Sequence, residues 1–323
     1  MTQPIDRLRD LFRAEHAEPT APEVSWFVEE ILRRHGAAVS AVLFYGSCLR
    51  KKNVVGGVLD FYAIVDSYRS AYGRGWLALA NAVLPPNVFM VSVRRGEQEA
   101  HAKYAVLSRE DFARGVTGAT LHSIVWARFC QPSRLVYSRD AAAPEAAACN
   151  SAEAAVTMVR TAMALAGVRG ERDLEPEALW EEGFRATYGT ELRPERPETI
   201  RELFAAAPER YAKVTAFAAA ELAARGDIVM PAAEACPLRV VVDPAWSSEL
   251  ARRWRRRTPR AKVVYFFRLI KSAFTFGDWL PYALWKLGRH TGVSVELTPR
   301  QRRYPLIFGW PVIFKLLVSQ KLR

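Results

Sequence analysis

A glycine-serine pair and an aspartate carry the strongest chemical signal in this sequence. Gly46 and Ser47 close the apolar run 37–45, and twelve residues separate Ser47 from Asp60, which lies in a second apolar run at 58–66. A glycine lets a backbone turn approach phosphate oxygens, which bind its N–H groups, and the serine hydroxyl can donate another hydrogen bond. An aspartate on the neighbouring strand can hold Mg2+ beside the same phosphates. The spacing therefore predicts a site for a metal-bound nucleoside triphosphate, although an ordinary strand that ends in a turn has the same pattern.

The second metal ligand is left open by the sequence. The position two residues after Asp60, which shares its face of the strand, holds Tyr62 instead of a carboxylate. Asp66 shares that face too, but lies roughly 20 Å away along an extended strand. We therefore take Asp60 as the first Mg2+ ligand and Asp66 as the candidate second ligand, with Glu97 and Glu191 as alternatives.

Apolar periodicity predicts the elements that position these residues. The runs 37–45 and 58–66 read as buried strands, and 87–95 with 103–108 as a hairpin around Gly96. Helices are expected at 22–35 and 71–84. The predicted fold class is α+β, a mixed sheet flanked by helices over residues 1–140. An Ala-rich helical domain is expected at 141–250, and a basic, amphipathic C-terminal region at 251–323.

The excess of positive over negative charge in this chain lies entirely in its last quarter. Residues 251–323 hold 17 Lys and Arg against two acidic residues, whereas the first 250 hold 29 against 32. Such asymmetry indicates an anionic partner, either nucleic acid or anionic lipid. The four cysteines form no CxxC pair, so structural zinc is not indicated and a reducing compartment is expected.

Aromatic content favours lipid over nucleic acid as that partner. The expected membrane-associating residues mix cationic and aromatic types, as interfacial anchors do: Arg255, Arg256, Arg257, Phe266, Phe267 and Trp310. The apolar run 304–319 would span only about 24 Å as a helix, against roughly 30 Å of hydrocarbon. We expect a cytoplasmic protein bound peripherally to the inner face of a membrane; the alternative is that these aromatic residues form domain core.

The order of strand, Gly-Ser turn, connection and Asp-bearing strand is the layout of the nucleotidyltransferase superfamily. Within it, the sequence resembles the mitochondrial-type phosphatidate cytidylyltransferases, the translocator assembly and maintenance family. The matching elements are Tyr45-Gly46-Ser47, Asp60-Phe61, Val65-Asp66, Lys103-Tyr104 through Ser108, Arg128-Phe129 with Pro132, and the segment 188–193. Ala127 stands where that family has Gly, and Glu191 where it has Asp.

The resemblance implies transfer of CMP from CTP to phosphatidic acid, giving CDP-diacylglycerol and pyrophosphate, with Mg2+ as cofactor. It implies Asp60 and Lys103 as catalytic residues, and Gly46, Ser47, Lys103 and Arg128 as the nucleotide-binding set. Two alternatives stay open at this point. One is nucleotidyl transfer to another acceptor, such as RNA or a small molecule. The other is a non-catalytic protein that binds lipid or nucleic acid.

Overall fold

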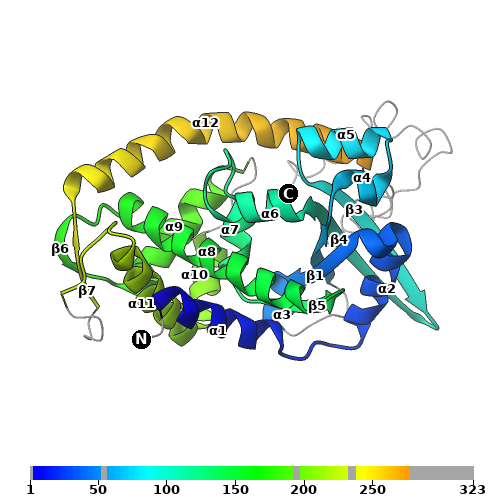
Figure 1. The fold of residues 1–323 in the computed structure, drawn as a ribbon, viewed down its shortest axis with the longest axis horizontal. Helices are drawn as coiled ribbons and strands as arrows, with labels where there is room; N and C mark the ends of the chain where they lie inside the picture. Colours follow the sequence, from blue (N-terminus) through cyan, green and yellow to red (C-terminus); the bar gives the residue numbers. More distant parts are fainter. Residues whose placement is uncertain (1–2, 52–56, 192–196, 232–237, 276–323) are drawn as a thin grey trace, which may run out of the picture.

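The computed structural model describes residues 3–51, 57–191, 197–231 and 238–275 (Figure 1). At its centre lies a mixed five-stranded sheet with the order β3-β4-β2-β1-β5. Its strands are β1 (Val39–Tyr45), β2 (Val58–Val65), β3 (Asn87–Arg95), β4 (Gln98–Ser108) and β5 (Ser133–Ser138). β2 and β4 run parallel, and the other neighbouring strands antiparallel. The expected α+β class, with a mixed sheet flanked by helices, is confirmed.

Strand β2 lies in the middle of the sheet, and its two faces enter different cores. Tyr62 and Ile64 pack on one side, and Phe61 and Val65 pack on the other. Because side chains alternate along a strand, Asp60 shares the face of Tyr62 and Ile64. Both faces are covered, so nearly every position of β2 is apolar and Asp60 is the acidic exception.

The Phe61 face of the sheet is covered by α2 (Glu23–His35). Its Phe27 ring lies 5.9 Å from the Phe61 ring, which in turn lies 5.2 Å from Phe44. The single helix expected at 71–84 is instead two helices, α4 (Tyr68–Tyr72) and α5 (Trp76–Val83). Gly73 takes a φ of +69° at the end of α4, a conformation that ends helices.

The Tyr62 face is covered by a thick helical layer. It contains α1 (Pro4–His16), α6 (Arg109–Val116), α7 (Ile124–Phe129), α8 (Ala142–Leu165), α9 (Pro176–Tyr188), α10 (Pro197–Ala205) and α11 (Pro208–Ala224). Trp180 and Tyr211 fill its interior, and the same core includes Tyr62 and Ile64 of the sheet. The sheet and the helices from 141 onward thus share one interior. Helix α1 also belongs to this layer, since it packs against α8 and α11.

A two-stranded ribbon interrupts the region expected to be helical. Strand β6 (Gly170–Asp173) pairs antiparallel with β7 (Arg239–Val242), where Val240 and Val242 are buried. The sequence of β6, Gly-Glu-Arg-Asp, has no apolar alternation, so periodicity could not reveal it. The ribbon closes one end of the helical layer.

The longest helix, α12 (Pro244–Thr275), arches over the helical layer and ends beside α5 and β3 (Figure 1). The boundary expected at 250 therefore falls inside this helix. Its inner side packs on α8, and its Trp254 ring lies 6.0 Å from the Trp126 ring of α7 between centroids. Among the described residues, none of the helices has the length and apolar content needed to cross a bilayer.

Candidate active site

Gly46 places the end of β1 directly against Asp60. Its φ is +93°, and a Cβ built on it would lie 2.7 Å from Asp60 Oδ2, closer than any side chain tolerates. Tyr45 and Asp60 are cross-strand partners, so the turn and the carboxylate meet at one sheet end. Ser47 follows as the first residue of the short helix α3 (Ser47–Arg50). The predicted contact between the Gly-Ser turn and Asp60 is therefore present.

Lys103 supplies the positive charge beside that carboxylate. Strands β2 and β4 are parallel and in register, which aligns Asp60 with Lys103. The Lys103 Nζ atom lies 3.0 Å from Asp60 Oδ1, and the side chains are 45% and 14% exposed. Oδ1 is buried, and the Lys103 ammonium supplies the positive charge beside it. The structure brings together four of the predicted residues: Gly46, Ser47, Asp60 and Lys103.

An aromatic floor lies under this group. The Tyr45 and Tyr62 rings lie 5.4 Å apart, and Phe129 lies 5.0 Å from Tyr62 and 5.8 Å from Tyr45. Burial, helped by the Asp60 charge, raises the pKa of Tyr45 well above its ordinary value, so this hydroxyl stays neutral. Tyr62 is 2% exposed. This packing explains why the position two residues after Asp60 holds an aromatic residue instead of a second carboxylate.

Arg128 directs its charge to Glu191. Its Nη2 atom donates to Glu191 Oε1 at 2.9 Å, and its Nη1 atom donates to the Ile124 carbonyl at 3.2 Å. Burial by itself would lower the pKa of Arg128, but the Glu191 carboxylate raises it by more. The pKa of Arg128 therefore lies well above its ordinary value. The hydroxyl of Tyr265, on α12, donates to Glu191 Oε2 at 3.4 Å. The Arg128 side chain thus forms an internal ion pair that connects α7 to Glu191. It does not point into an open site where it could contact a phosphate.

The other candidate carboxylates lie apart from Asp60. Asp66 accepts hydrogen bonds from Arg139 at 2.5 and 3.1 Å and has Arg109 at 3.5 Å. These arginines lower its pKa, Arg139 most strongly. Asp66 follows the last residue of β2, six residues beyond Asp60, and is held by these arginines, so the two carboxylates do not share a metal. Glu97 is exposed in the turn between β3 and β4. Within the described ranges, no three His, Cys, Asp or Glu side chains form a metal-binding group.

Asp60 alone is suited to hold a metal ion at this site. The carboxylate of Asp60, with the Lys103 charge beside Oδ1 and the glycine backbone in place of a side chain beside Oδ2, fits one metal ligand. Mg2+ commonly uses one or two carboxylates and completes its shell with substrate phosphates and water. The residues present therefore fit a Mg2+ ion that arrives with a nucleotide.

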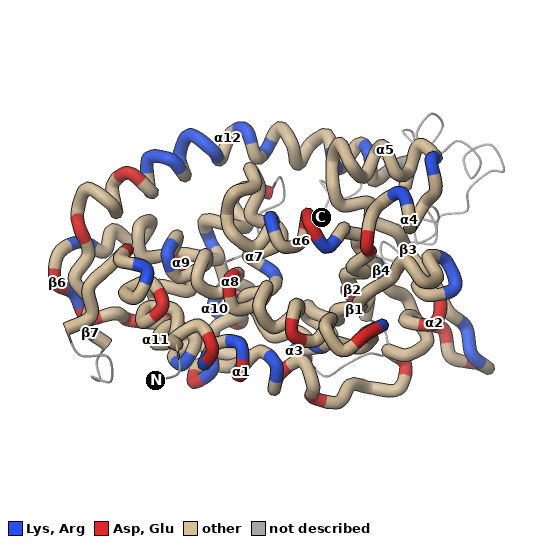
Figure 2. The backbone as a smooth tube through the Cα atoms, viewed as in Figure 1, with Lys and Arg blue, Asp and Glu red and all other residues tan. Residues whose placement is uncertain are grey.

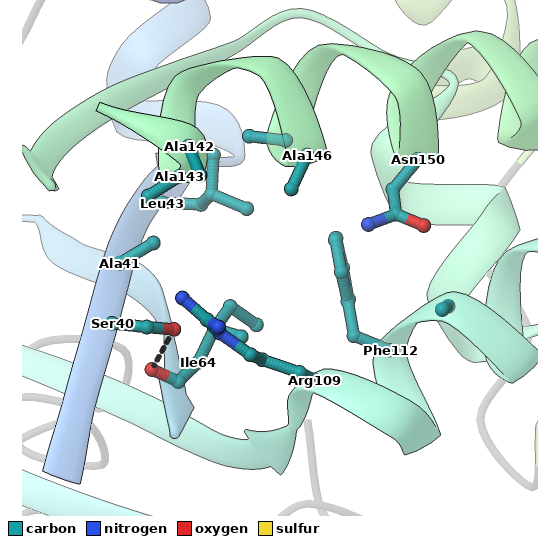
Figure 3. Close-up of a pocket in the computed structure, with 12 residues that line it drawn as sticks. Ser40, Ala41, Leu43, Ile64, Arg109, Phe112, Ala142, Ala143, Ala146 and Asn150 are labelled. Carbon is teal, nitrogen blue, oxygen red and sulfur yellow. Dashed lines mark hydrogen bonds between the residues drawn. The ribbon is translucent and has the colours of Figure 1, made fainter. Parts of the chain in front are cut away.

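A hollow lies on the same sheet face as Asp60, at the opposite end of β2 (Figure 3). Its volume is about 240 Å³, and Leu43, Ile64 and Phe112 line it together with alanines of α8. Arg109 lies at its edge and is held by Asp66 and Asp140. Asp60 and Lys103 are not among its lining residues, so this apolar pocket is separate from the candidate active site.

The residues expected to meet a membrane divide into two groups. Arg255 and Arg256 are exposed in the basic first half of α12 (Figure 2), and Phe266 and Phe267 are 51% and 54% exposed in its second half. Arg257, in contrast, turns inward and donates to two backbone carbonyls of the α6–α7 loop. It therefore does not belong to the exposed face. Trp310 lies outside the described residues.

Helix α5 extends the exposed apolar area. Trp76, Leu79 and Val83 are 56%, 68% and 74% exposed, and their spacing puts them on one side of α5. Lys271 of α12 donates to the Leu84 carbonyl and, at 2.8 Å, to the Pro86 carbonyl, directly after α5. We name the α5–α12 apolar surface after its exposed members: Trp76, Leu79, Val83, Val263, Phe266, Phe267, Leu269 and Ile270. These aromatic residues of α12 are not domain core.

Arg268 is the residue of this region that sequence reasoning missed. It lies on the opposite side of α12 from Val263 and Phe267 and is only 8% exposed. The helical period placed it off the apolar face, but the period cannot show what the other face contacts.

No protein-family model matches this chain, and the search of curated proteins finds no match.

Proposed function

We propose that this protein is a nucleotidyltransferase of the phosphatidate cytidylyltransferase type, which joins CMP from CTP to phosphatidic acid at a membrane surface. The observation that carries the proposal is the contact of Gly46 with Asp60, with the Lys103 ammonium 3.0 Å from the same carboxylate. A close backbone turn, a carboxylate and a cation form a suitable site for a metal-bound triphosphate. The choice of CTP and phosphatidic acid comes from the sequence resemblance.

The reaction is an in-line displacement at phosphorus. A phosphate oxygen of phosphatidic acid attacks the α-phosphorus of CTP and forms the new P–O bond. The bond between the α-phosphorus and the bridging oxygen breaks, and pyrophosphate leaves with that electron pair. The attacking phosphate is already anionic near neutral pH, so no general base has to remove a proton. The raised pKa of Tyr45 agrees with this, because a neutral phenol beside Asp60 is no base.

Positioning and charge neutralisation then account for catalysis. The Gly46-Ser47 turn would hold the phosphates of the leaving pyrophosphate, and Lys103 would neutralise part of their charge. Asp60 would hold a Mg2+ ion, whose charge would offset the repulsion between the two anionic substrates. The aromatic floor of Tyr45, Tyr62 and Phe129 keeps water away from one side of the carboxylate.

The α5–α12 apolar surface supports the membrane part of the proposal. Isolated exposed apolar side chains are normal, but eight on two adjoining helices form a patch of the kind that binds membranes or partners. Arg255 and Arg256 extend from the same helix and would add about 1 kcal/mol each near anionic lipid. Peripheral binding to the inner face of the membrane follows, with the apolar helix face in the headgroup region.

The decisive experiment measures product formation by the purified protein. CTP, Mg2+ and phosphatidate-containing vesicles should give CDP-diacylglycerol and one pyrophosphate for each product molecule. Parallel reactions with ATP, GTP or UTP, and with an RNA oligonucleotide in place of lipid, test the base and the acceptor. Transfer of the nucleotide to RNA but not to lipid would show that RNA is the acceptor. Absence of transfer to either acceptor would refute the proposal that the protein is an enzyme.

Tyr62 in place of a second carboxylate favours one competing function, nucleotide binding without turnover. Melting temperatures with CTP and Mg2+ distinguish the two. A shift that requires Asp60, without pyrophosphate release, would support the non-catalytic alternative.

A further inference from the structure

Arg268 is a buried cation that forms no ion pair with a carboxylate of the described residues. Its side chain lies on the inner side of α12 and is 8% exposed, and its Nε and Nη1 atoms are buried without a hydrogen-bond partner in the described part of the chain. Burial lowers the pKa of this guanidinium to about 10. Buried arginines are normally paired with carboxylates, as Arg210 is with Glu15 at 2.5 Å in this same chain. An unpaired one is unfavourable for folding, which points to a ligand that supplies the missing charge.

Other buried donors surround Arg268 and do not compensate its charge. Arg257 donates to backbone carbonyls, yet its Nη2 atom is also buried without a partner. Burial and then Arg268 and Arg257 lower the pKa of His122 to about 2, so this imidazole is neutral, and its Nδ1 has no partner either. Among the described residues, neither Arg257 nor Arg268 forms an ion pair with a carboxylate. Glu191, the nearby acidic residue, is already engaged by Arg128 and Tyr265.

The location of Arg268 links it to the candidate active site. Burial raises the pKa of Tyr62, and the nearby charges of Arg128 and then Arg268 counter that rise; Tyr62 is two residues after Asp60 on the same side of β2. Tyr265, one turn earlier on α12, donates a hydrogen bond to Glu191. Burial raises its pKa, and the nearby Lys103 charge partly opposes that rise. The donors of Arg268 therefore lie on the α12 side of the site, whereas Gly46 and Ser47 lie at the end of β1.

We propose that Arg268 binds the phosphate monoester of the acceptor lipid, on the side of the site opposite the nucleotide turn. This inference rests on the proposed function and names one residue of its acceptor subsite. Arg268 faces inward from the same helical segment that presents Phe266 and Phe267 to the outside. A phosphate headgroup could then reach Arg268 while its acyl chains stay against the α5–α12 apolar surface. A guanidinium suits this task because its planar donors match phosphate oxygens.

Kinetics of Arg268→Gln test the assignment. With soluble dihexanoyl phosphatidate as acceptor, the KM for phosphatidate should rise about tenfold to a hundredfold. The KM for CTP should stay within about twofold of the wild-type value. Arg201→Gln, an exposed arginine on α10, is the matched control and should change neither constant. A rise in the KM for CTP with that for phosphatidate unchanged would assign Arg268 to the nucleotide and overturn the proposal.

A binding measurement separates this proposal from the proposed function. Dihexanoyl phosphatidate should raise the melting temperature of the wild-type protein and of Arg201→Gln, but not that of Arg268→Gln. Inorganic phosphate tests whether the headgroup alone suffices, and dihexanoyl phosphatidylcholine tests whether the acyl chains do. Binding that depends on Arg268 without any CMP transfer would keep this inference and refute the enzyme. CMP transfer with wild-type kinetics in Arg268→Gln would support the enzyme and refute the role of Arg268.

The sign of the stability change gives a third readout. Without ligand, Arg268→Gln should melt at the wild-type temperature or a few degrees higher, because the variant removes a buried, unpaired charge. A clearly lower melting temperature would mean that Arg268 is structural. Arg268→Lys, which keeps a charge but loses the planar donors, should retain part of the phosphatidate-dependent shift. If phosphatidate raised the melting temperatures of Arg268→Gln and the wild type equally, the assignment of Arg268 to the phosphate would be wrong.

Discussion

Asp60 and Lys103 lie opposite each other on two parallel strands and form an ion pair 3.0 Å long at the end of the sheet. The pair is in register because β2 and β4 are both buried strands whose pairing is fixed along eight consecutive positions. The register fixes the backbone positions of both residues. A rigid pair of this kind can align two charged substrates with little reorganisation.

Asp60→Asn should reduce CMP transfer at least about a thousandfold while leaving the fold intact. The amide keeps the shape but loses the charge that would hold Mg2+. Since Lys103 is half-exposed, loss of the ion pair should change the unfolding free energy by less than about 1 kcal/mol. Pyrophosphate release and urea denaturation measure the two effects.

Asp66→Asn is the matched control for that variant. Asp66 directly follows the strand that carries Asp60 but is held by Arg139 and Arg109, away from the site. Transfer at the wild-type rate is expected. If Asp66→Asn were as inactive as Asp60→Asn, the separation of the two carboxylates would be wrong.

Gly46→Ala should lose activity at least about a hundredfold, because the new methyl group would lie 2.7 Å from Asp60 Oδ2 and displace the carboxylate. Its positive φ adds a strain of about 1 kcal/mol. Gly36→Ala has a similar φ, +55°, but no atom within 4 Å of its Cβ. Comparable activity losses in the two variants would show that backbone strain, and not the contact with Asp60, is responsible.

Glu191→Gln should destabilise the protein by about 3–5 kcal/mol, because it leaves Arg128 buried without its counter-charge. Glu30→Gln is the comparison: Glu30 pairs with Arg33 and Arg34 at the surface, and its loss should cost less than about 1 kcal/mol. Urea denaturation measures both. Equal stabilities of the two variants would contradict a structural role for the Arg128–Glu191 pair.

Stability should fall in mild acid because of His16. Burial, then Arg134 and Arg210, lowers the pKa of its imidazole to about 4. The unfolded chain binds this proton from about pH 6.5 downward, whereas the folded protein binds it only near pH 4. The contribution of His16 is therefore complete above pH 6.5 and is lost as the pH falls toward 4, by about 3 kcal/mol in total.

His16→Gln isolates that contribution from the other titrating groups. The difference in unfolding free energy between wild type and variant should shrink between pH 7 and pH 4. A difference that does not depend on pH would show that His16 titrates alike in both states.

Phe267→Asn should weaken binding to vesicles that contain phosphatidate, since it removes part of the α5–α12 apolar surface. Sedimentation with vesicles should show a loss in partitioning of about tenfold. Val229→Asn changes another exposed apolar residue, which is 61% exposed and lies next to the β6–β7 ribbon. Partitioning reduced equally by both variants would argue against a specific surface.

The strands and the Gly46–Asp60 contact could be predicted because the signals are local. Apolar runs fix β1 and β2, and the hairpin of β3 and β4 turns at Gly96 as expected. The antiparallel pairing of β1 with β2 then brings the turn of one strand beside the aspartate of the other. Sequence spacing contains all of this information.

The partners of individual charges could not be predicted in the same way. Arg128 and Glu191 are 63 residues apart, and Arg257 bonds to carbonyls 136 and 139 residues before it. A helical period distinguishes two faces of α12, but the burial of Arg268 depends on which face the sheet covers. Such contacts follow from tertiary packing, which no local pattern records.

Helix α1 has a consequence for how this protein assembles during synthesis. Its partners α8 and α11 begin at Ala142 and Pro208, and Arg210 reaches back to Glu15 of α1. The ribosome therefore releases α1 long before the surfaces that bury its apolar side exist. Until α11 emerges, the apolar side of α1 is incompletely covered, and the helical layer can close only after residue 224 has been made.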